Sequence, residues 1–349
     1  MFEHRYFPSS LLEKWFNHHY SLPYTVLGHS ELGSEIIGLH LGDGPLKVLI
    51  WSQMHGNEST ATRGLLKWLE THSEYWKQQE HISLLIIPQL NPDGANSYTR
   101  ENSKGVDLNR DALNQSQVEM KLFRQVIATY KPDFAFNLHD QRTRFTVGRT
   151  AKEAALSFLS AAADLERTIT STRLKSMQVI VEISEALGDF KPYLGRYDDS
   201  FNENCTGDFL QARNIPTVLV EAGQLGNDYS RSVVVDKVAL SLEVGLQSLI
   251  RDTSYQVESI VQRYEAIPEN TSYGYDELII VAPETQFWVR YIEEFKDGRV
   301  RYIPEFHPFD VAESCWSMSR FEYRFDSHST EERAHVARRA EQYNSLRNS

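Results

Sequence analysis

The feature that most limits the possible folds is an alternation of short apolar runs with helical patterns. The apolar runs lie at residues 48–51, 82–88, 134–138 and 217–220. Runs of this kind are typical of strands that are buried on both faces of a sheet. Helical patterns lie at residues 60–71, 117–130, 151–165 and 233–250. Strands that alternate with helices predict an α/β fold with a mixed, mostly parallel sheet flanked by helices on both faces.

The pattern changes after about residue 253. Residues 276–281, 287–295 and 300–306 predict strands, and Lys296-Asp297-Gly298 predicts a hairpin turn between the last two. A charged helix is expected over residues 330–343. We therefore predict a large domain over residues 1–253 and a small β-rich C-terminal appendage over residues 254–349 that ends in a helix.

Composition excludes several classes of protein. Lys and Arg number 36 against 48 Asp and Glu, a formal net charge of −12, which argues against a nucleic-acid partner. No apolar run, such as residues 84–87, approaches the length needed to cross a membrane. The first residues lack the pattern of a secretory signal, and two cysteines are too few for a disulfide framework, so we expect a cytoplasmic protein with reduced thiols.

The first candidate site is His55-Gly56-Asn57-Glu58. It follows one predicted strand and precedes the helix at residues 60–71. A histidine and a glutamate on such a corner can point at one centre, and an imidazole with a carboxylate suits zinc. The alternative is structural, with His55 bonded to the loop backbone and Glu58 capping the helix.

A third ligand is predicted at His139. It follows the apolar run at residues 134–138, so it should emerge at the same edge of the sheet as His55. Two histidines and one glutamate are the ligand set of a hydrolytic zinc site, which leaves a position for water. The adjacent Asp140 could orient an imidazole, although an aspartate in this place is more often a solvated residue or a helix cap.

Glu221 is the candidate general base. It ends the apolar run at residues 217–220, and a carboxylate there is costly unless it is paired or takes part in chemistry. Gly223 would let the chain turn away and leave the carboxylate facing a cleft. The alternative is a buried salt bridge.

Two loops between these residues suit substrate binding. Arg100 lies in one loop, and Asn109 and Arg110 lie in the other. An arginine beside an asparagine can bind a carboxylate, and a second arginine can stabilise an oxyanion. The alternative is that both arginines are surface residues that pair with nearby aspartates.

Taken in order, five motifs resemble the zinc metallocarboxypeptidase family, the carboxypeptidase A-like enzymes. The resemblance covers about residues 25–252. The matching motifs are His55-Gly56-Asn57-Glu58, Asn91-Pro92-Asp93-Gly94, Gly105-Val106-Asp107-Leu108-Asn109-Arg110, Asn137-Leu138-His139 and Val220-Glu221-Ala222-Gly223.

The resemblance implies one Zn²⁺ ion held by His55, Glu58 and His139, with Glu221 as the general base. These are the residues to which their positions at strand ends had already pointed. The large domain is accordingly expected to be a zinc carboxypeptidase-like catalytic domain.

The resemblance also implies roles for the residues of the two loops. Asn109 and Arg110 look like the clamp on a free terminal carboxylate, and Arg100 is similar to the arginine that polarises the scissile carbonyl. The family has an active-site tyrosine, and Tyr193 and Tyr197 lie in the corresponding stretch.

The function expected is that of a zinc metallocarboxypeptidase, which hydrolyses the amide bond of a C-terminal residue with a free carboxylate. One alternative is an N-acyl amino acid deacylase that resembles succinylglutamate desuccinylase and aspartoacylase. Another is a cell-wall peptide amidase. A third is a non-catalytic zinc-binding module, against which the presence of Glu221 argues, since binding alone does not need that carboxylate.

Overall fold

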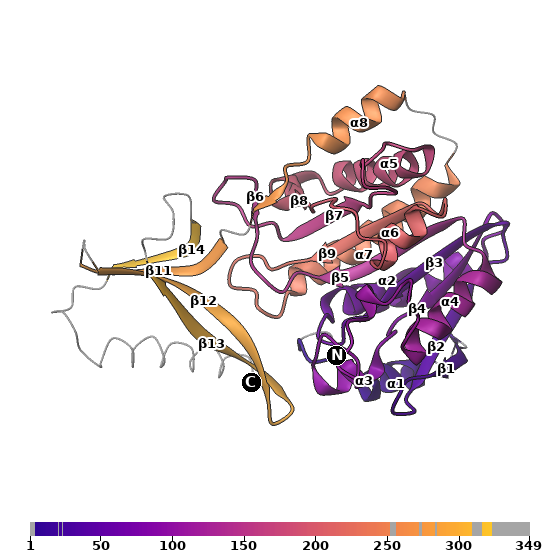
Figure 1. Ribbon diagram of the computed structural model, residues 1–349, viewed down its shortest axis with the longest axis horizontal. Coiled ribbons are helices and arrows are strands. Elements are labelled where there is room, and N and C mark those ends of the chain that lie inside the picture. The colour runs from indigo at the N-terminus through magenta and orange to yellow at the C-terminus, as the bar shows by residue number, and fades with distance from the viewer. Residues whose placement is uncertain are drawn as a thin grey trace.

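The computed structural model describes residues 4–19, 21–22, 24–251, 256–271, 274–282, 285–308 and 316–322. Its main element is an eight-stranded sheet with the order β1-β2-β4-β3-β5-β9-β7-β8 (Figure 1). The strands are β1 (Tyr24–His29), β2 (Glu35–Leu41), β3 (Leu46–Ser52), β4 (Ile82–Ile87), β5 (Phe134–Asp140), β7 (Leu156–Ser160), β8 (Leu194–Arg196) and β9 (Thr217–Ala222).

The centre of this sheet is parallel and its margins are mixed. Strands β4, β3, β5 and β9 run parallel to their neighbours in that order. The pairs β1–β2, β2–β4 and β7–β9 are antiparallel, and β7–β8 is parallel. The mixed, mostly parallel α/β fold expected from the sequence is confirmed.

Helices cover both faces of the sheet. The α-helices are α1 (Ser9–His18), α2 (Thr60–Lys77), α3 (Pro92–Ser97), α4 (Val118–Tyr130), α5 (Ser171–Ala186), α6 (Thr206–Gln211), α7 (Ser232–Ile250) and α8 (Val257–Glu265). Two short 3₁₀ helices are η1 (Leu108–Arg110) and η2 (Gly188–Tyr193). None of the described helices is long and apolar enough to cross a membrane.

Alternate residues of the central strands supply two separate apolar cores. Val48 and Ile50 of β3 pack with helices α1, α2, α5, α7 and α8. Leu49 and Trp51 pack on the opposite face with helices α4 and α6. This division follows from the strand period of two residues, and it explains why the central strands are apolar at every position.

The helix expected over residues 151–165 is wrong. Residues 156–160 form strand β7, which pairs with β9 on one side and β8 on the other. All five residues of β7 are buried, so the segment has no polar face for a surface helix, and pairing with two strands satisfies its backbone. The helix lies further along as α5, where the Thr170 side chain accepts a hydrogen bond from the Arg173 backbone and caps its first turn.

The described C-terminal residues form a second, four-stranded sheet with the order β13-β12-β11-β14, which lies to one side of the large sheet (Figure 1). Its strands are β11 (Gly274–Ala282), β12 (Thr285–Lys296), β13 (Arg299–Pro308) and β14 (Trp316–Glu322). The predicted hairpin between β12 and β13 is confirmed. Asp297 and Gly298 both have positive φ, 54° and 73°, as a two-residue turn of type I′ requires.

The start of the predicted appendage packs with the large domain. Ile260 and Tyr264 of α8 are buried in the same apolar core as α5, and the Tyr264 hydroxyl accepts a hydrogen bond from the backbone of Ser160. A short strand β10 (Asn270–Thr271) pairs with β6 (Thr146–Val147). The domain boundary after residue 253 stays a prediction, and the helix expected over residues 330–343 lies outside the described residues.

Candidate metal centre and active site

Three neighbouring parallel strands, β3, β5 and β9, bring the candidate residues to one edge of the sheet. Ser52 at the end of β3 pairs with Leu138, and His139 of β5 pairs with Glu221 of β9. Carboxyl ends of adjacent parallel strands lie at the same edge, which is where active sites of such sheets form. The convergence expected from the sequence is therefore confirmed for His55, His139 and Glu221.

The loop that carries His55 and Glu58 is held against helix α3 by a glycine. A side chain at Gly56 would place its Cβ within 1.9 Å of the Gly94 backbone, so no larger residue fits without moving one of the two segments. The Gln53 side chain donates a hydrogen bond to the Gly56 carbonyl at 2.8 Å. The close approach explains why glycine separates the two candidate ligands.

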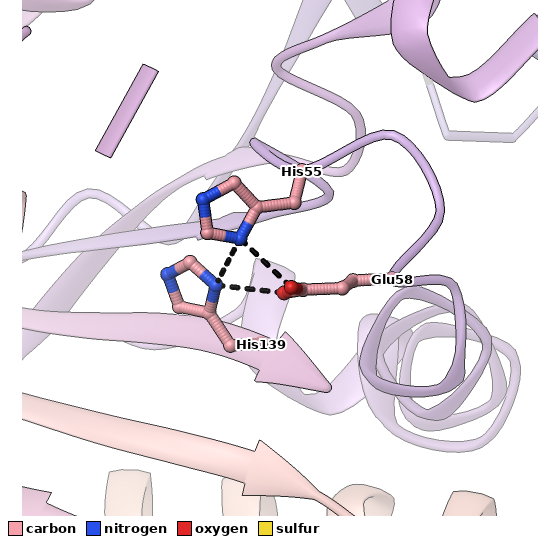
Figure 2. A group of neighbouring side chains, drawn as sticks. All are labelled: His55, Glu58 and His139. Carbon is pink, nitrogen blue, oxygen red and sulfur yellow. Dashed lines mark hydrogen bonds and ion pairs between the residues drawn. The ribbon is translucent and has the colours of Figure 1, made fainter. Parts of the chain in front are cut away.

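His55, Glu58 and His139 form one compact, buried cluster (Figure 2). The Nδ1 atom of His55 lies 2.8 Å from Glu58 Oε1, and Nδ1 of His139 lies 2.8 Å from Glu58 Oε2. The two Nδ1 atoms are 3.1 Å apart. Each of the three residues is 2% exposed.

This arrangement fits a bound cation. A tetrahedral zinc ion holds neighbouring ligand atoms about 3.4 Å apart, close to the separations of the two nitrogens and the carboxylate. Burial lowers the pKa of His139 and so favours the neutral imidazole that binds metals. Burial alone would raise the pKa of Glu58, but the two imidazoles hold it well below its usual value, so the carboxylate is charged. Two imidazoles and a carboxylate are a zinc ligand set.

Asp107 and Arg100 surround the cluster. Asp107 Oδ1 accepts a hydrogen bond from His55 Nε2 at 3.0 Å, which fixes the ring so that Nδ1 faces the other ligands. Arg100 donates through Nε to Asp107 at 3.1 Å and through Nη1 to Glu58 Oε1 at 3.2 Å. The pairing of Arg100 with an aspartate was the structural alternative at the sequence level. The structure adds that this aspartate also orients a candidate ligand, a role the sequence did not reveal.

Asp140 is a helix cap and not the partner of an imidazole. Its carboxylate accepts hydrogen bonds from the backbone N–H groups of Thr60 and Ala61, at 2.8 and 3.0 Å, at the start of α2. It also forms a salt bridge of 2.9 Å with the buried Arg5. The backbone N–H of Asp140 donates to Glu58 Oε2 at 3.1 Å, so the cap also helps to place a ligand.

Glu221 lies beside the cluster without a partner of its own. Its carboxylate forms no hydrogen bond or salt bridge with any residue that the structure describes, so the buried salt bridge considered from the sequence is not present there. Burial raises the pKa of Glu221 well above its ordinary value, and the charges of Glu58 and Asp140 raise it further. A carboxylate with a raised pKa is a stronger proton acceptor than an ordinary one, as a general base requires.

Of the two tyrosines in the candidate stretch, Tyr197 is the one near these carboxylates. Burial raises the pKa of its hydroxyl, and the charges of Glu221 and Glu58 add to this. Tyr193, the last residue of η2, instead contacts the Phe190 ring.

Asn109 and Arg110 lie together at η1. Asn109 Oδ1 accepts a hydrogen bond from the Thr206 backbone at 2.8 Å, which orients the side-chain amide. Arg110 is exposed, and its Nη1 donates to the Asn109 carbonyl at 2.8 Å and lies 3.1 Å from the Cys205 sulfur. Among the described residues, Nε and Nη2 of Arg110 form no hydrogen bond, so these donors are available to a ligand.

The fold and the cluster are similar to those of zinc carboxypeptidases. A sequence model described as zinc carboxypeptidase matches residues 16–157, which include His55, Glu58, Asn109, Arg110 and His139. The family predicted from the sequence is confirmed for this region. Glu221 lies beyond it, and its position beside His139 comes from the structure.

Two fungal relatives align with part of the chain. Carboxypeptidase 2 of Trichophyton tonsurans is 28% identical over 133 residues, which are 36% of this chain and 23% of the relative. The probable carboxypeptidase 2 of Trichophyton verrucosum is 29% identical over 110 residues, 30% of this chain and 20% of the relative. The chain therefore spans only about a fifth of the length of these curated relatives.

Solved structures share the fold over most of the chain. A putative carboxypeptidase A from Shewanella denitrificans superposes with a TM-score of 0.57 at 17% identity and covers 70% of both chains. A metallo-carboxypeptidase from Burkholderia cenocepacia has a TM-score of 0.54 at 15% identity, again over 70% of both chains. At these identities the comparison establishes the fold.

Proposed function

We propose that this protein is a zinc-dependent carboxypeptidase that removes a C-terminal residue with a free carboxylate from a peptide. The observation that carries the proposal is the unpaired Glu221 carboxylate on the strand next to His139, at the edge where the three candidate ligands meet. The family match and the names of the two fungal relatives support peptide hydrolysis as the reaction.

His55, Glu58 and His139 hold the ion in this proposal. Zinc, when bound, lowers the pKa of a coordinated water to about 7 and polarises the substrate carbonyl. Glu221 accepts the proton of the attacking water and then donates it to the leaving amine. Its raised pKa makes Glu221 a stronger proton acceptor than an ordinary carboxylate.

The remaining residues bind and orient the substrate. Arg100 is 36% exposed in its side chain and lies beside Glu58, so its guanidinium can reach the carbonyl oxygen and stabilise the negative charge that develops there. Asn109 and Arg110 bind the terminal carboxylate through the Asn109 amide and the free Arg110 donors. Fixing the chain end determines which bond is cut.

The test compares pairs of blocked dipeptides that differ only in a free or an amidated C-terminus. The proposal predicts zinc-dependent hydrolysis of the free acids and little or none of the amides, because amidation removes the charge that Arg110 binds. A zinc chelator serves as the control. Equal cleavage of acids and amides would rule out a carboxypeptidase, and cleavage confined to acylated single amino acids would point to the deacylase.

A further inference from the structure

The candidate metal centre is connected to the C-terminal sheet through a buried glutamate. Glu293 of β12 is 10% exposed in its side chain, and its carboxylate lies among Arg5, Arg142 and Tyr98. Its Oε2 accepts from Arg142 Nη2 at 2.7 Å, and its Oε1 accepts from Arg5 Nη2 at 3.1 Å. Tyr98 donates its hydroxyl to the same carboxylate.

One route from Glu293 leads to the loop between two ligands. Arg142 follows His139 by three residues, and its Nη1 donates a hydrogen bond of 2.9 Å to the Asn57 carbonyl. Asn57 lies between His55 and Glu58. Glu293 therefore holds a guanidinium that fastens the backbone of the ligand loop.

A second route leads through Arg5. While one side of its guanidinium binds Glu293, Arg5 Nη1 binds Asp140 at 2.9 Å. Asp140 caps the helix that follows Glu58, and its own N–H donates to the Glu58 carboxylate. Both routes end at residues that place Glu58 and its neighbours.

Glu293 differs from its neighbours in β12 in the face of the strand that it occupies. Successive side chains of a strand point to opposite faces, and the flanking Ile292 and Glu294 are both exposed. Glu293 faces the large domain and neutralises the buried Arg5 and the more exposed Arg142. Removing one member of a buried charge cluster leaves the other charges uncompensated, which destabilises the folded state. The segments that these charges hold in place then become less well fixed.

We infer that Glu293 is a positioning residue, through which the C-terminal sheet fixes the loop and helix start that carry the proposed zinc ligands. The inference rests on the proposed zinc centre. It gives the appendage a role in the active site, without contact to substrate. The readout is zinc affinity, which a residue that merely joined the two sheets would not change in the folded protein.

The experiment measures zinc affinity of the metal-free full-length chain by competition with a chromogenic chelator, well below the unfolding temperature. Glu293→Gln keeps the size of the side chain and removes its charge. We expect its zinc affinity to fall about tenfold or more, as for residues that orient ligands. The matched control Glu294→Gln, on the exposed face of the same strand, is expected to bind zinc like the wild type.

Unchanged zinc affinity of folded Glu293→Gln overturns the inference and leaves the proposed function standing. A wild-type chain that binds no zinc overturns both. If Glu293→Gln does not fold, Arg142→Met replaces it. This variant removes the bonds of Arg142 to Asn57, Glu293 and Tyr98 and keeps the aliphatic stem. Weaker zinc binding by Arg142→Met supports the inference, and wild-type binding overturns it.

Discussion

His139 and Glu221 occupy paired positions on the adjacent parallel strands β5 and β9. Paired residues of neighbouring strands point to the same face, so a candidate ligand and the candidate base stand side by side. A shift of one residue in this pairing would turn Glu221 to the opposite face. The register of two core strands thus sets the position of the proposed base relative to the metal.

Replacing Glu221 with Gln is expected to leave zinc bound and to lower kcat by about 10² to 10⁴ fold, the usual contribution of a general base. Gln keeps the shape of the side chain and cannot take up the proton. Zinc content by elemental analysis and steady-state kinetics on a free-acid dipeptide check both parts. Glu13→Gln, at an exposed position of α1, is the control. Activity close to wild type would remove Glu221 from the reaction.

Asp107→Asn is expected to weaken zinc binding by about 10 to 100 fold, because the charged acceptor that orients the His55 ring is lost. The same substitution at the exposed Asp189, which has no partner among the described residues, should have no effect. Chelator competition measures the difference. Equal zinc affinities of the two variants would show that the contact between Asp107 and His55 has no role in holding the metal.

Arg110→Ala is expected to raise KM for free-acid peptides by about 10 to 100 fold with a smaller change in kcat, since a charged hydrogen bond to the substrate end is lost. Any residual cleavage of amidated peptides should stay the same. Arg149→Ala, at an exposed arginine without a described partner, is the comparison. A KM that does not change would place the carboxylate clamp elsewhere.

Asp208 predicts a pH-dependent effect on stability. Burial raises its pKa to about 6, although the Asn202 backbone donates to its carboxylate. The unfolded value is about 3.9, so ionisation is harder in the folded state. The group therefore lowers stability as pH rises from about 4 to about 6, and the cost, about 2 to 3 kcal/mol, stays constant above that.

Asp208→Asn removes this cost and retains an acceptor for Asn202. Relative to the wild type, the variant should be more stable at pH 7.5 than at pH 4, by up to that amount. Urea unfolding of both proteins at the two pH values gives the comparison. The same difference between variant and wild type at both pH values would contradict the burial argument.

The sequence predicted the site residues whose positions depend on the local sequence around them. His55 and His139 follow apolar runs that could only be core strands, and Glu221 ends another. Once those runs were assigned to a parallel sheet, the ends had to meet at one edge. The motifs then supplied the chemistry. The hairpin at Asp297 and Gly298 was predicted for the same reason, because its turn depends on adjacent residues.

The residues that the sequence did not reveal contact partners that are far away along the chain. Asp107 binds His55 across 52 positions, and Glu293 binds Arg5 across 288 positions. Nothing in the neighbourhood of an arginine or a glutamate shows which partner the fold will bring to it. The stretch containing β7 misled for a related reason, because its Ala-rich flank suggested a helix while pairing with β9 decided the outcome.

A crystal structure of the zinc-loaded protein, with diffraction data collected on both sides of the zinc absorption edge, would locate the metal directly. If these three residues hold zinc, one anomalous peak will lie about 2.0 to 2.2 Å from a nitrogen of His55, a nitrogen of His139 and the Glu58 carboxylate. Glu221 should face that peak without being one of its ligands. A peak elsewhere, or none at this cluster in protein soaked with zinc, would show that His55, Glu58 and His139 are not the zinc ligands.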